Sequence, residues 1–249
     1  RMMSVSGAGY EPKGEFHVER DRDTLQREYF SLLMNGVLLC NDAELMLEGD
    51  KWLIKGDPTE GALAVVAVKA GFHQNEVKKQ YPRTGELPFS SERKRMTSIH
   101  STPHGDRIVY MKGAPEVILE RCIQVHESSK VEKLTEKRRK DILNINEEMA
   151  GEALRVLGIA YKKISAGITN LNEEALENDL IFLGLMGMMD PPREEAIKAV
   201  EVCKQVKIKP IMITGDHKLT AIAVAREMGI YQEGDIVLTG EDLEKMVEE

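Results

Sequence analysis

The spacing of apolar positions over the first two thirds of the chain predicts short strands mixed with helices. Apolar side chains recur at helical spacing over residues 23–40, which predicts a helix. Residues 51–55 predict a short strand that follows a Gly-Asp turn. Residues 96–101 and 107–112 predict two antiparallel strands, because the loop between them is rich in turn formers. Helices beside local hairpins indicate an α+β domain around an antiparallel sheet.

One helix start is marked by capping chemistry. Asp57 can cap the free amides, Pro58 suits the first helical position, and Glu60 follows three residues after the cap. Gly71 is placed to end this helix. The pattern predicts three more elements: helices at residues 114–122 and 135–154, and a strand at residues 155–161.

From about residue 180 the pattern changes to strand, helix, strand, helix. Residues 180–189 are almost wholly apolar, as in a strand buried on both faces. A helix then precedes a short apolar strand at residues 209–213, and a second helix runs to Gly229. Such a strand–helix–strand unit is right-handed by default, and its ligands sit beyond the carboxyl ends of the strands. Residues 214–216, which come directly after the second strand, are therefore a candidate site.

The composition is that of a globular protein. Hydrophobic residues make up 42% and charged residues 31% of the 249 residues, which is enough for a real core. The formal net charge of -8 argues against a nucleic-acid binder, and a polyanion such as ATP would need local basic clusters. The three cysteines lie far apart, so we expect no disulfide framework and a reducing cytosol. The longest apolar run is about half of a membrane span, so we expect a soluble chain.

Two segments carry chemistry that suits a nucleotide. Thr59 and Glu60 stand at the predicted helix start, where free amides can bond to a ligand, although capping alone explains these residue types. Phe89 stands just before a basic triplet at residues 93–95. An aromatic face can stack a purine and cations can hold its phosphates. The same sequence also fits a phenylalanine in the core beside a solvated basic turn.

Weaker signals occur further along the chain. Lys112 ends a predicted strand among apolar neighbours, and Gly113 and Ala114 leave room for a ligand to approach the backbone, although a snorkelling lysine fits as well. Arg155 opens a strand and suits a phosphate, as guanidinium groups do. At residues 214–216, a hydroxyl and successive amides can hold a phosphoryl group, or Asp216 can simply cap a helix.

Metal sites and the common nucleotide-binding loops find no support in the sequence. His100 and His104 are four residues apart, but the intervening proline forbids a metal-binding helix. Neither a GxxxxGK[ST] loop nor a GxGxxG loop occurs. We therefore assign no metal ligands to the chain, and a nucleotide site here must use another architecture.

Taken in order, five of these segments resemble the cytoplasmic region of P-type cation-transporting ATPases, most closely the calcium-pump-like branch. They are Gly-Asp-Pro-Thr-Glu at 56–60, Pro-Phe-Ser-Ser-Glu-Arg-Lys at 88–94, Met-Lys-Gly-Ala-Pro-Glu at 111–116, Asp-Pro-Pro-Arg at 190–193 and Met-Ile-Thr-Gly-Asp at 212–216. The resemblance covers nearly the whole chain. Each motif is modest alone, but five in family order are highly specific.

The resemblance implies two domains. An α+β nucleotide-binding domain, with an antiparallel sheet flanked by helices, would span residues 1–189. Part of an α/β phosphorylation domain of the haloacid-dehalogenase-like type would span residues 190–249. Asp190 would mark the hinge to the second domain, where Thr214, Gly215 and Asp216 would belong to the phosphoryl and magnesium site.

The same resemblance assigns roles in the nucleotide-binding domain. Phe89 would stack on adenine, with Thr59 and Glu60 on the adenine side. The remaining residues would line the pocket, admit the ligand closely or reach its phosphates: Lys94, Lys112, Gly113, Ala114 and Arg155. One departure is Ser91, which stands where some calcium pumps carry an arginine, and Arg93 lies near but displaced.

Two family motifs do not occur in the chain. The phosphorylated aspartate sits in an Asp-Lys-Thr-Gly-Thr motif, and a later Gly-Asp-Gly-Val-Asn-Asp motif binds magnesium; neither string is present. Residues 1–5 resemble the family's segment directly downstream of the aspartate motif. We therefore expect a segment that holds a whole nucleotide-binding domain and part of a phosphorylation domain.

The implied parent is an ATP-driven cation pump that uses ATP and Mg²⁺. An aspartate of the parent would take the terminal phosphoryl group, and hydrolysis of the acyl phosphate would come next. The chain alone is expected to bind ATP and to be inactive as an ATPase. Its partners would be ATP and the remainder of the pump, namely the actuator and transmembrane domains. No nucleic acid and no direct membrane contact are expected, and the chain would be a cytoplasmic domain of an integral membrane protein.

Other functions stay open. A non-catalytic domain that binds a small ligand or a partner could use the same fold. A free-standing phosphatase of the same superfamily is disfavoured because the nucleophile is absent. The transported cation stays open among calcium, sodium or potassium, and protons, because the family's ion ligands lie in membrane helices.

Overall fold

The computed structural model describes most of the chain as two compact units. The described residues are 2–7, 9–18, 28–127, 130–152, 154–165, 172–189, 194–214, 218–240 and 242–243. One unit joins Arg1–Leu143 to Val156–Met186, and the other joins Asn144–Arg155 to Gly187–Glu249. The first unit holds every residue that the sequence assigns to adenine.

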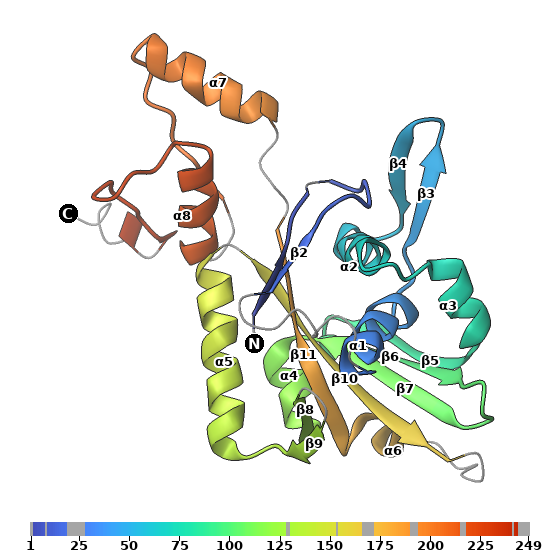
Figure 1. Ribbon diagram of the computed structural model, residues 1–249. Coiled ribbons are helices and arrows are strands. Elements are labelled where there is room, and N and C mark those ends of the chain that lie inside the picture. Colours follow the sequence, from blue (N-terminus) through green and yellow to red (C-terminus); the bar gives the residue numbers. More distant parts are fainter. Residues whose placement is uncertain are drawn as a thin grey trace. The chain divides into compact units, whose positions relative to one another are not determined.

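A seven-stranded, mostly antiparallel sheet forms the first unit (Figure 1), so the expected α+β class is confirmed for this part. Its strands run in the order β5-β6-β7-β10-β11-β8-β9. Their bounds are β5 Arg83–Ser90, β6 Arg95–Ser101, β7 Arg107–Gly113, β8 Cys122–Glu127, β9 Lys130–Lys133, β10 Arg155–Ile164 and β11 Leu180–Met188. The antiparallel pairing of β6 with β7 is the predicted hairpin. Strand β11 pairs with β8 in parallel.

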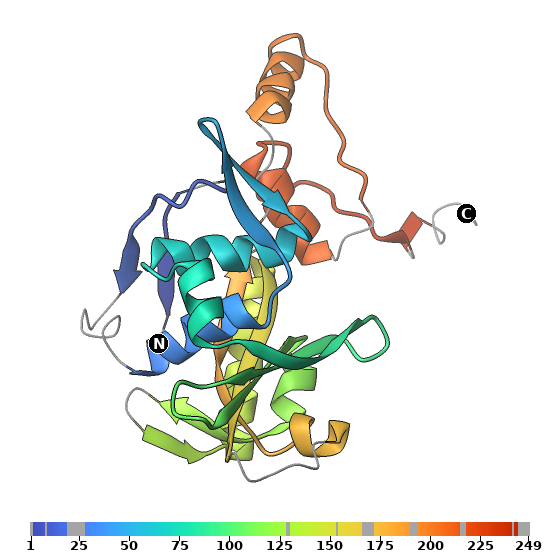
Figure 2. The same ribbon diagram turned by 90° about the vertical axis from the view of Figure 1, so that its right-hand side faces the viewer.

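Helices cover both faces of this sheet (Figure 2). They are α1 Glu28–Leu39, α2 Pro58–Lys69, α3 Gln74–Gln80, α4 Pro115–Glu120, α5 Glu136–Gly151 and α6 Glu173–Glu177. Two short pairs lie outside the main sheet: β1 Met3–Val5 with β2 Phe16–Val18, and β3 Glu44–Glu48 with β4 Lys51–Lys55. The predicted strand at 51–55 is therefore confirmed as β4. The helix predicted at 23–40 is confirmed over α1, and its first residues lie outside the described part.

Strand register sorts the side chains onto two faces. Tyr110 and Tyr161 are cross-strand partners between β7 and β10, and Met111 and Ala160 are the next pair. Because successive residues point to opposite faces, these two pairs lie on opposite sides of the sheet. Met111 and Ala160 belong to one buried cluster with residues of α4 and α5.

Helix α1 packs on the opposite face, close to the sheet. An added Cβ at Gly36 would lie 2.9 Å from Tyr110 Cδ1 and 3.2 Å from Ile159 Cγ2. Only glycine allows this approach without movement of its neighbours. Helices α1 and α2 therefore share the face on which Tyr110 lies.

The start of α2 has the predicted capping chemistry. The Asp57 carboxylate accepts from the amides of Thr59 at 2.9 Å and Glu60 at 3.2 Å, and Pro58 is the first helical residue. Gly71, with a φ of 87°, follows the C-terminal turn of this helix. The backbone amides of Thr59 and Glu60 therefore do take part in the helix cap, as the capping alternative expects. It leaves both side chains available for other contacts.

The strand–helix–strand prediction for the second unit is wrong in one element. Helices α7 Glu194–Gln205 and α8 Lys218–Glu227 form as expected, and Gly229 follows α8. Residues 209–213, however, form no strand, and Ile211 and Ile213 are 79% and 92% exposed. A parallel strand needs a neighbour to satisfy its backbone, and β11, the expected neighbour, pairs with β8 in the first unit. The described part of the chain thus does not form the parallel sheet that was expected after residue 190.

His100 makes stability depend on pH. Its ring is 1% exposed, and its nitrogens contact the Tyr81 carbonyl at 3.0 Å and Ser98 Oγ at 2.9 Å. Burial lowers the pKa of His100 to about 4, so the folded chain keeps the ring neutral where the unfolded chain protonates it.

We therefore expect the free energy of unfolding to fall by about 2 kcal/mol between pH 7 and pH 5 through this residue alone. The stabilisation is complete above the unfolded pKa of about 6.5 and is lost as pH falls towards about 4. Urea unfolding of the wild type and of His100→Gln at both pH values measures it. The variant should be less stable at pH 7 and show a smaller loss on acidification. Equal losses in both proteins would contradict the account.

Candidate nucleotide-binding site

Phe89 is a large aromatic side chain that the fold leaves 59% exposed. It lies in β5, at the edge of the seven-stranded sheet. Leu87 is the partner of Thr97, and Ser90 is the partner of Arg95, so three residues of β5 span the distance of two in β6. Such a bulge shifts the alternation of side chains. Ser90, rather than Phe89, therefore shares the face of Leu87, and the phenyl ring is turned away from that face.

The turn after Phe89 brings Lys94 against Gly113 and Ala114. Lys94 has a φ of 51°, and its amide donates to the Ser90 carbonyl at 2.8 Å. Its own carbonyl accepts from the Ala114 amide at 3.0 Å. A Cβ on Gly113 would lie 2.3 Å from that carbonyl, so glycine is required here. The Lys94 side chain is exposed, which leaves its ammonium group accessible.

Lys112 is not a snorkelling lysine. It is 5% exposed, and its Nζ lies 2.5 Å from Oε1 of Glu60, which projects from the first turn of α2. The other oxygen, Oε2, accepts from the Asp42 amide at 2.9 Å. A buried ammonium needs such a partner, because an unpaired charge in the interior is strongly unfavourable. The pair joins the helix layer to the sheet directly beside Gly113.

Four backbone positions from neighbouring strands form one row across the sheet. Ser90 is the partner of Arg95, Arg95 of Gly113, and Gly113 of Gly158. Since neighbouring strands lie about 4.8 Å apart, residues next to this row are close in space. Phe89, Lys94, Lys112 and Ala114 each lie one residue from a member of the row. The structure thus gathers at one end of the sheet the predicted residues of β5, the β5–β6 turn and β7.

Two arginines of the basic triplet are already paired. Arg93 and Arg95 both contact the carboxylate of Glu177, which is fully buried at the end of α6. Arg95 Nε lies 2.6 Å from Glu177 Oε2. Lys94, between them, is the member of the triplet that the fold leaves exposed. The sequence did not mark Glu177, because its partners lie more than 80 residues earlier and no local pattern surrounds it.

Of the other predicted residues, Thr59 lies next to this site, and the structure does not bring the rest to it. Thr59 is half-buried beside Glu60 at the start of α2. Arg155 is exposed at the start of β10 and belongs to the second unit, so its phosphate role stays a prediction. Thr214 is exposed and lies in no helix or strand, while Gly215 and Asp216 lie outside the described residues. The hinge residue Asp190 lies outside them too.

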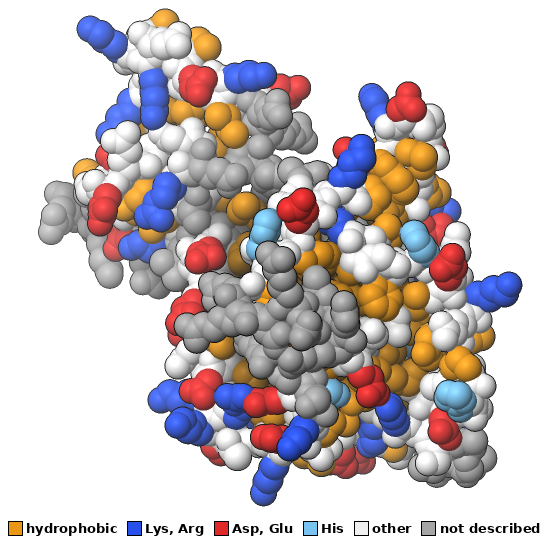
Figure 3. Space-filling view, in the orientation of Figure 1, with side chains coloured by type: hydrophobic (Ala, Val, Ile, Leu, Met, Phe, Trp, Pro, Cys, Tyr) orange, Lys and Arg blue, Asp and Glu red, His pale blue; other side chains and the backbone are white. Residues whose placement is uncertain are grey.

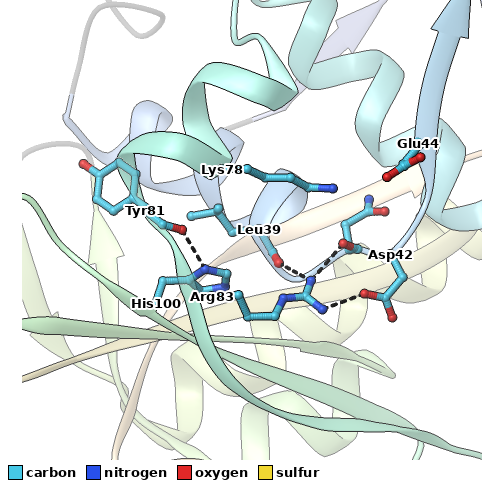
Figure 4. A pocket seen from close by; sticks show the side chains of 8 residues that line it. Leu39, Asp42, Glu44, Lys78, Tyr81, Arg83 and His100 are labelled. Carbon is cyan, nitrogen blue, oxygen red and sulfur yellow. Dashed lines mark hydrogen bonds and ion pairs between the residues drawn. The ribbon is translucent and has the colours of Figure 1, made fainter.

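A separate pocket of about 300 Å³ opens beside α1 and α3 (Figure 4). Its lining shares no residue with the predicted nucleotide set: Leu39, Asn41, Asp42, Glu44, Lys78, Tyr81, Arg83 and His100. Arg83 is bonded there to Asp42 and Glu86, each at 2.6 Å, and to the Leu39 and Asn41 carbonyls. Protein groups thus satisfy the hydrogen bonds of the Arg83 guanidinium. These bonds stabilise the end of α1, and they leave the guanidinium no need of a ligand.

On the face shown in Figure 3, basic and acidic side chains interleave without an extended patch of either sign. Among the described residues, no three histidine, cysteine, aspartate or glutamate side chains are grouped to hold a metal ion. None of the helices in that same part of the chain is long and apolar enough to cross a membrane.

Known proteins are similar to this sequence. A family model described as the P-type ATPase cytoplasmic domain N matches residues 30–195. The chain is 42% identical over 218 residues to "Calcium-transporting ATPase 1" of Lactococcus lactis, covering 88% of this chain and 24% of the relative. It is 41% identical over 257 residues to "Cation-transporting ATPase pma1" of Synechocystis, covering 97% and 27%.

A third relative extends the pattern. Identity to "Calcium-transporting ATPase" of Bacillus subtilis is 35% over 246 residues, covering 98% of this chain and 28% of the relative. The chain thus spans about a quarter of the length of the curated relatives it matches. The family model covers more than half of the chain, and the relatives carry the names of the same class of pump. The chain therefore belongs to the P-type ATPase family, and residues 30–195 correspond to its cytoplasmic domain N.

Proposed function

We propose that this chain is the ATP-binding cytoplasmic part of an ATP-driven cation pump that works through an aspartyl phosphate. One observation carries the proposal: a 59% exposed phenyl ring stands at the bulged end of β5, beside the exposed Lys94. A soluble fold gains by burying such a ring, so its exposure next to a cation suits a ligand with an aromatic base and an anionic tail.

Each side chain of the site has a distinct task in this proposal. Phe89 stacks on adenine. Lys94 attracts the phosphates, which are joined to adenine through the ribose. The Glu60–Lys112 pair fixes the inner wall, where Thr59 and Glu60 contact the adenine side. Gly113 and Ala114 line that wall with small residues. A larger residue at 113 would displace the Lys94 carbonyl. Arg155 adds a second phosphate contact.

Phosphoryl transfer in this proposal belongs to the family's phosphorylation domain. We assign residues 190–249 to part of the phosphorylation domain, with Thr214, Gly215 and Asp216 beside the phosphoryl group and Mg²⁺. In the parent, an aspartate oxygen bonds to the γ-phosphorus as the bond to the β-phosphate oxygen breaks, so that ADP leaves. Water then hydrolyses the acyl phosphate. Mg²⁺ bound with ATP would neutralise charge on the transferring group.

The names of the relatives bear on which cation is transported and on what this chain is part of. Two of the three are called calcium-transporting and one cation-transporting, which favours calcium within the broader class of cations. The partners of this chain would be ATP and the rest of a pump in the membrane, with this part on the cytoplasmic side. The alternative, a domain that binds another small ligand or a partner, predicts no specific ATP binding.

Replacing Phe89 by alanine should weaken ATP binding by about 1–3 kcal/mol, roughly fivefold to 150-fold, because stacking is lost. Isothermal titration calorimetry measures the affinity. Phe89→Tyr keeps the ring and should bind nearly as the wild type does. Leu47→Ala, which truncates another exposed apolar side chain on β3, is the matched control. Equal affinity of wild type and Phe89→Ala would contradict the site, and a wild type without ATP affinity would favour the alternative.

Lys94→Gly isolates the phosphate contact. Lys94 has a positive φ, which glycine adopts without strain, so the turn should be kept while the charge is removed. We expect ATP binding to weaken by about 1 kcal/mol, roughly fivefold, as for an exposed ion pair. Adenosine binding should not change, and the difference should shrink at high salt. A parallel loss of adenosine affinity would show that the substitution disturbs the base site instead.

The chain by itself should not turn over ATP, because the family's phosphorylated aspartate motif does not occur in its sequence. Phosphate release from Mg-ATP, monitored over hours with the purified chain, should equal the rate in buffer alone. Phe89→Ala, purified in the same way, is the control for contaminating ATPases. Sustained, magnesium-dependent release that is lost in Phe89→Ala would overturn this expectation.

A further inference from the structure

Glu177 is a carboxylate with no exposed surface, at the last residue of α6. It accepts from Thr97 Oγ1 at 2.6 Å and from Arg95 Nε at 2.6 Å, and it forms an ion pair with Arg93. A buried carboxylate is tolerated only when it is paired and hydrogen-bonded in this way. Three donors on one side chain therefore fix its position relative to β6.

We call Glu177 together with Arg93 and Arg95 the clamp. Helix α6, which carries Glu177, is held against the sheet. Leu176, the neighbour of Glu177, is 4% exposed and belongs to a buried cluster with Val109 of β7 and Ile164 of β10. Asn172 caps α6 by accepting from the Ala175 amide at 2.8 Å. Helix α6 is thus anchored to the centre of the sheet, and it holds the carboxylate in a fixed place.

The clamp acts on both ends of the β5–β6 turn. The Arg93 amide contacts Ser90 Oγ at 3.2 Å, and the Arg93 side chain reaches the Pro88 carbonyl at 3.4 Å. Pro88 and Ser90 are the two neighbours of Phe89. Arg95, on the other side of Lys94, donates to the Arg93 carbonyl at 3.2 Å. The two arginines that Glu177 holds therefore flank Lys94 in the chain, and Arg93 contacts both neighbours of Phe89.

The direction of the side chains adds to this. Arg95 and Thr97 share the face of the sheet that α6 covers, because both contact Glu177. Lys94 lies between two arginines turned towards that carboxylate, and its positive φ breaks the alternation. The pairing leaves one exposed cation out of three next to Phe89. An unpaired triplet would instead be a mobile basic turn.

We propose that Glu177 is a positioning residue for nucleotide binding: by holding Arg93 and Arg95, it fixes the turn that presents Phe89 to the base and Lys94 to the phosphates. This inference rests on the proposed function. Glu177 contacts neither of those two side chains, so it acts through the turn. Glu173, which is exposed, also pairs with Arg93 at 3.2 Å and with Arg95 at 3.6 Å, so Glu177 is the buried one of two carboxylates that hold this turn.

The test is a double-mutant cycle between Glu177→Gln and Phe89→Ala, with ATP affinity measured by calorimetry on proteins shown by circular dichroism to be folded. Glu177→Gln keeps the shape of the side chain and removes its charge. It should weaken ATP binding about tenfold in the wild-type background, as misplacement of a binding group does. In the Phe89→Ala background its effect should fall below about fivefold, and in a background with both Phe89→Ala and Lys94→Gly below about twofold, because the side chains that it positions are then absent. Glu174→Gln, an exposed residue of the same helix, is the control for the charge change.

The outcomes separate this inference from the proposed function. A wild type without ATP affinity contradicts the proposed function itself. Normal ATP binding by folded Glu177→Gln, while Phe89→Ala is weak, overturns the positioning role alone. An equal loss in both backgrounds also overturns it, because a purely structural role predicts that result. Should Glu177→Gln not fold, Thr97→Val removes one donor from the carboxylate and must show the same non-additivity, with about a threefold loss.

Discussion

The ion pair between Lys112 and Glu60 is the contact on which the site depends, because it joins the two layers of the first unit at the point where the ligand would lie. Its atoms are 2.5 Å apart, and Lys112 is almost fully buried. The second carboxylate oxygen of Glu60 accepts from the Asp42 amide. The backbone carbonyl of Glu60 accepts from the side-chain amide of the buried Asn41 at 2.8 Å. One residue thus ties α2, the end of α1 and β7 together. Removal of either charge would leave the other unpaired in the interior.

One half-buried carboxylate and one fully buried carboxylate hold cations on the two faces of the sheet. Glu60 pairs with Lys112 on the face of α1 and α2, and Glu177 pairs with two arginines on the face of α6. Between them, the edge strand β5 bulges and Phe89 is left exposed. Arg93, Arg95 and Lys112 are held by these carboxylates, and Lys94 is the cation left exposed in the turn after Phe89. In a chain with a formal net charge of -8, a polyanion would depend on such a local cation.

Local patterns in the sequence predicted the features that local physics determines. The Asp57 cap and the β6–β7 hairpin each depend on neighbouring residues, and each is present in the structure. The clamp on Glu177 and the bulge before Ser90 depend on residues far apart in the chain, so no window of sequence contains them. The strand predicted at 209–213 failed for a related reason, since apolar alternation cannot supply the neighbouring strand that a sheet requires.

The most direct test is whether adenine lies on the Phe89 ring. Nuclear Overhauser effects between the adenine H2 and H8 protons of bound ATP and assigned aromatic protons would measure it, with the Phe16 and Phe30 rings as internal references. The account predicts strong contacts to Phe89 and none to the other two rings. Saturable ATP binding without any contact to Phe89 would contradict it.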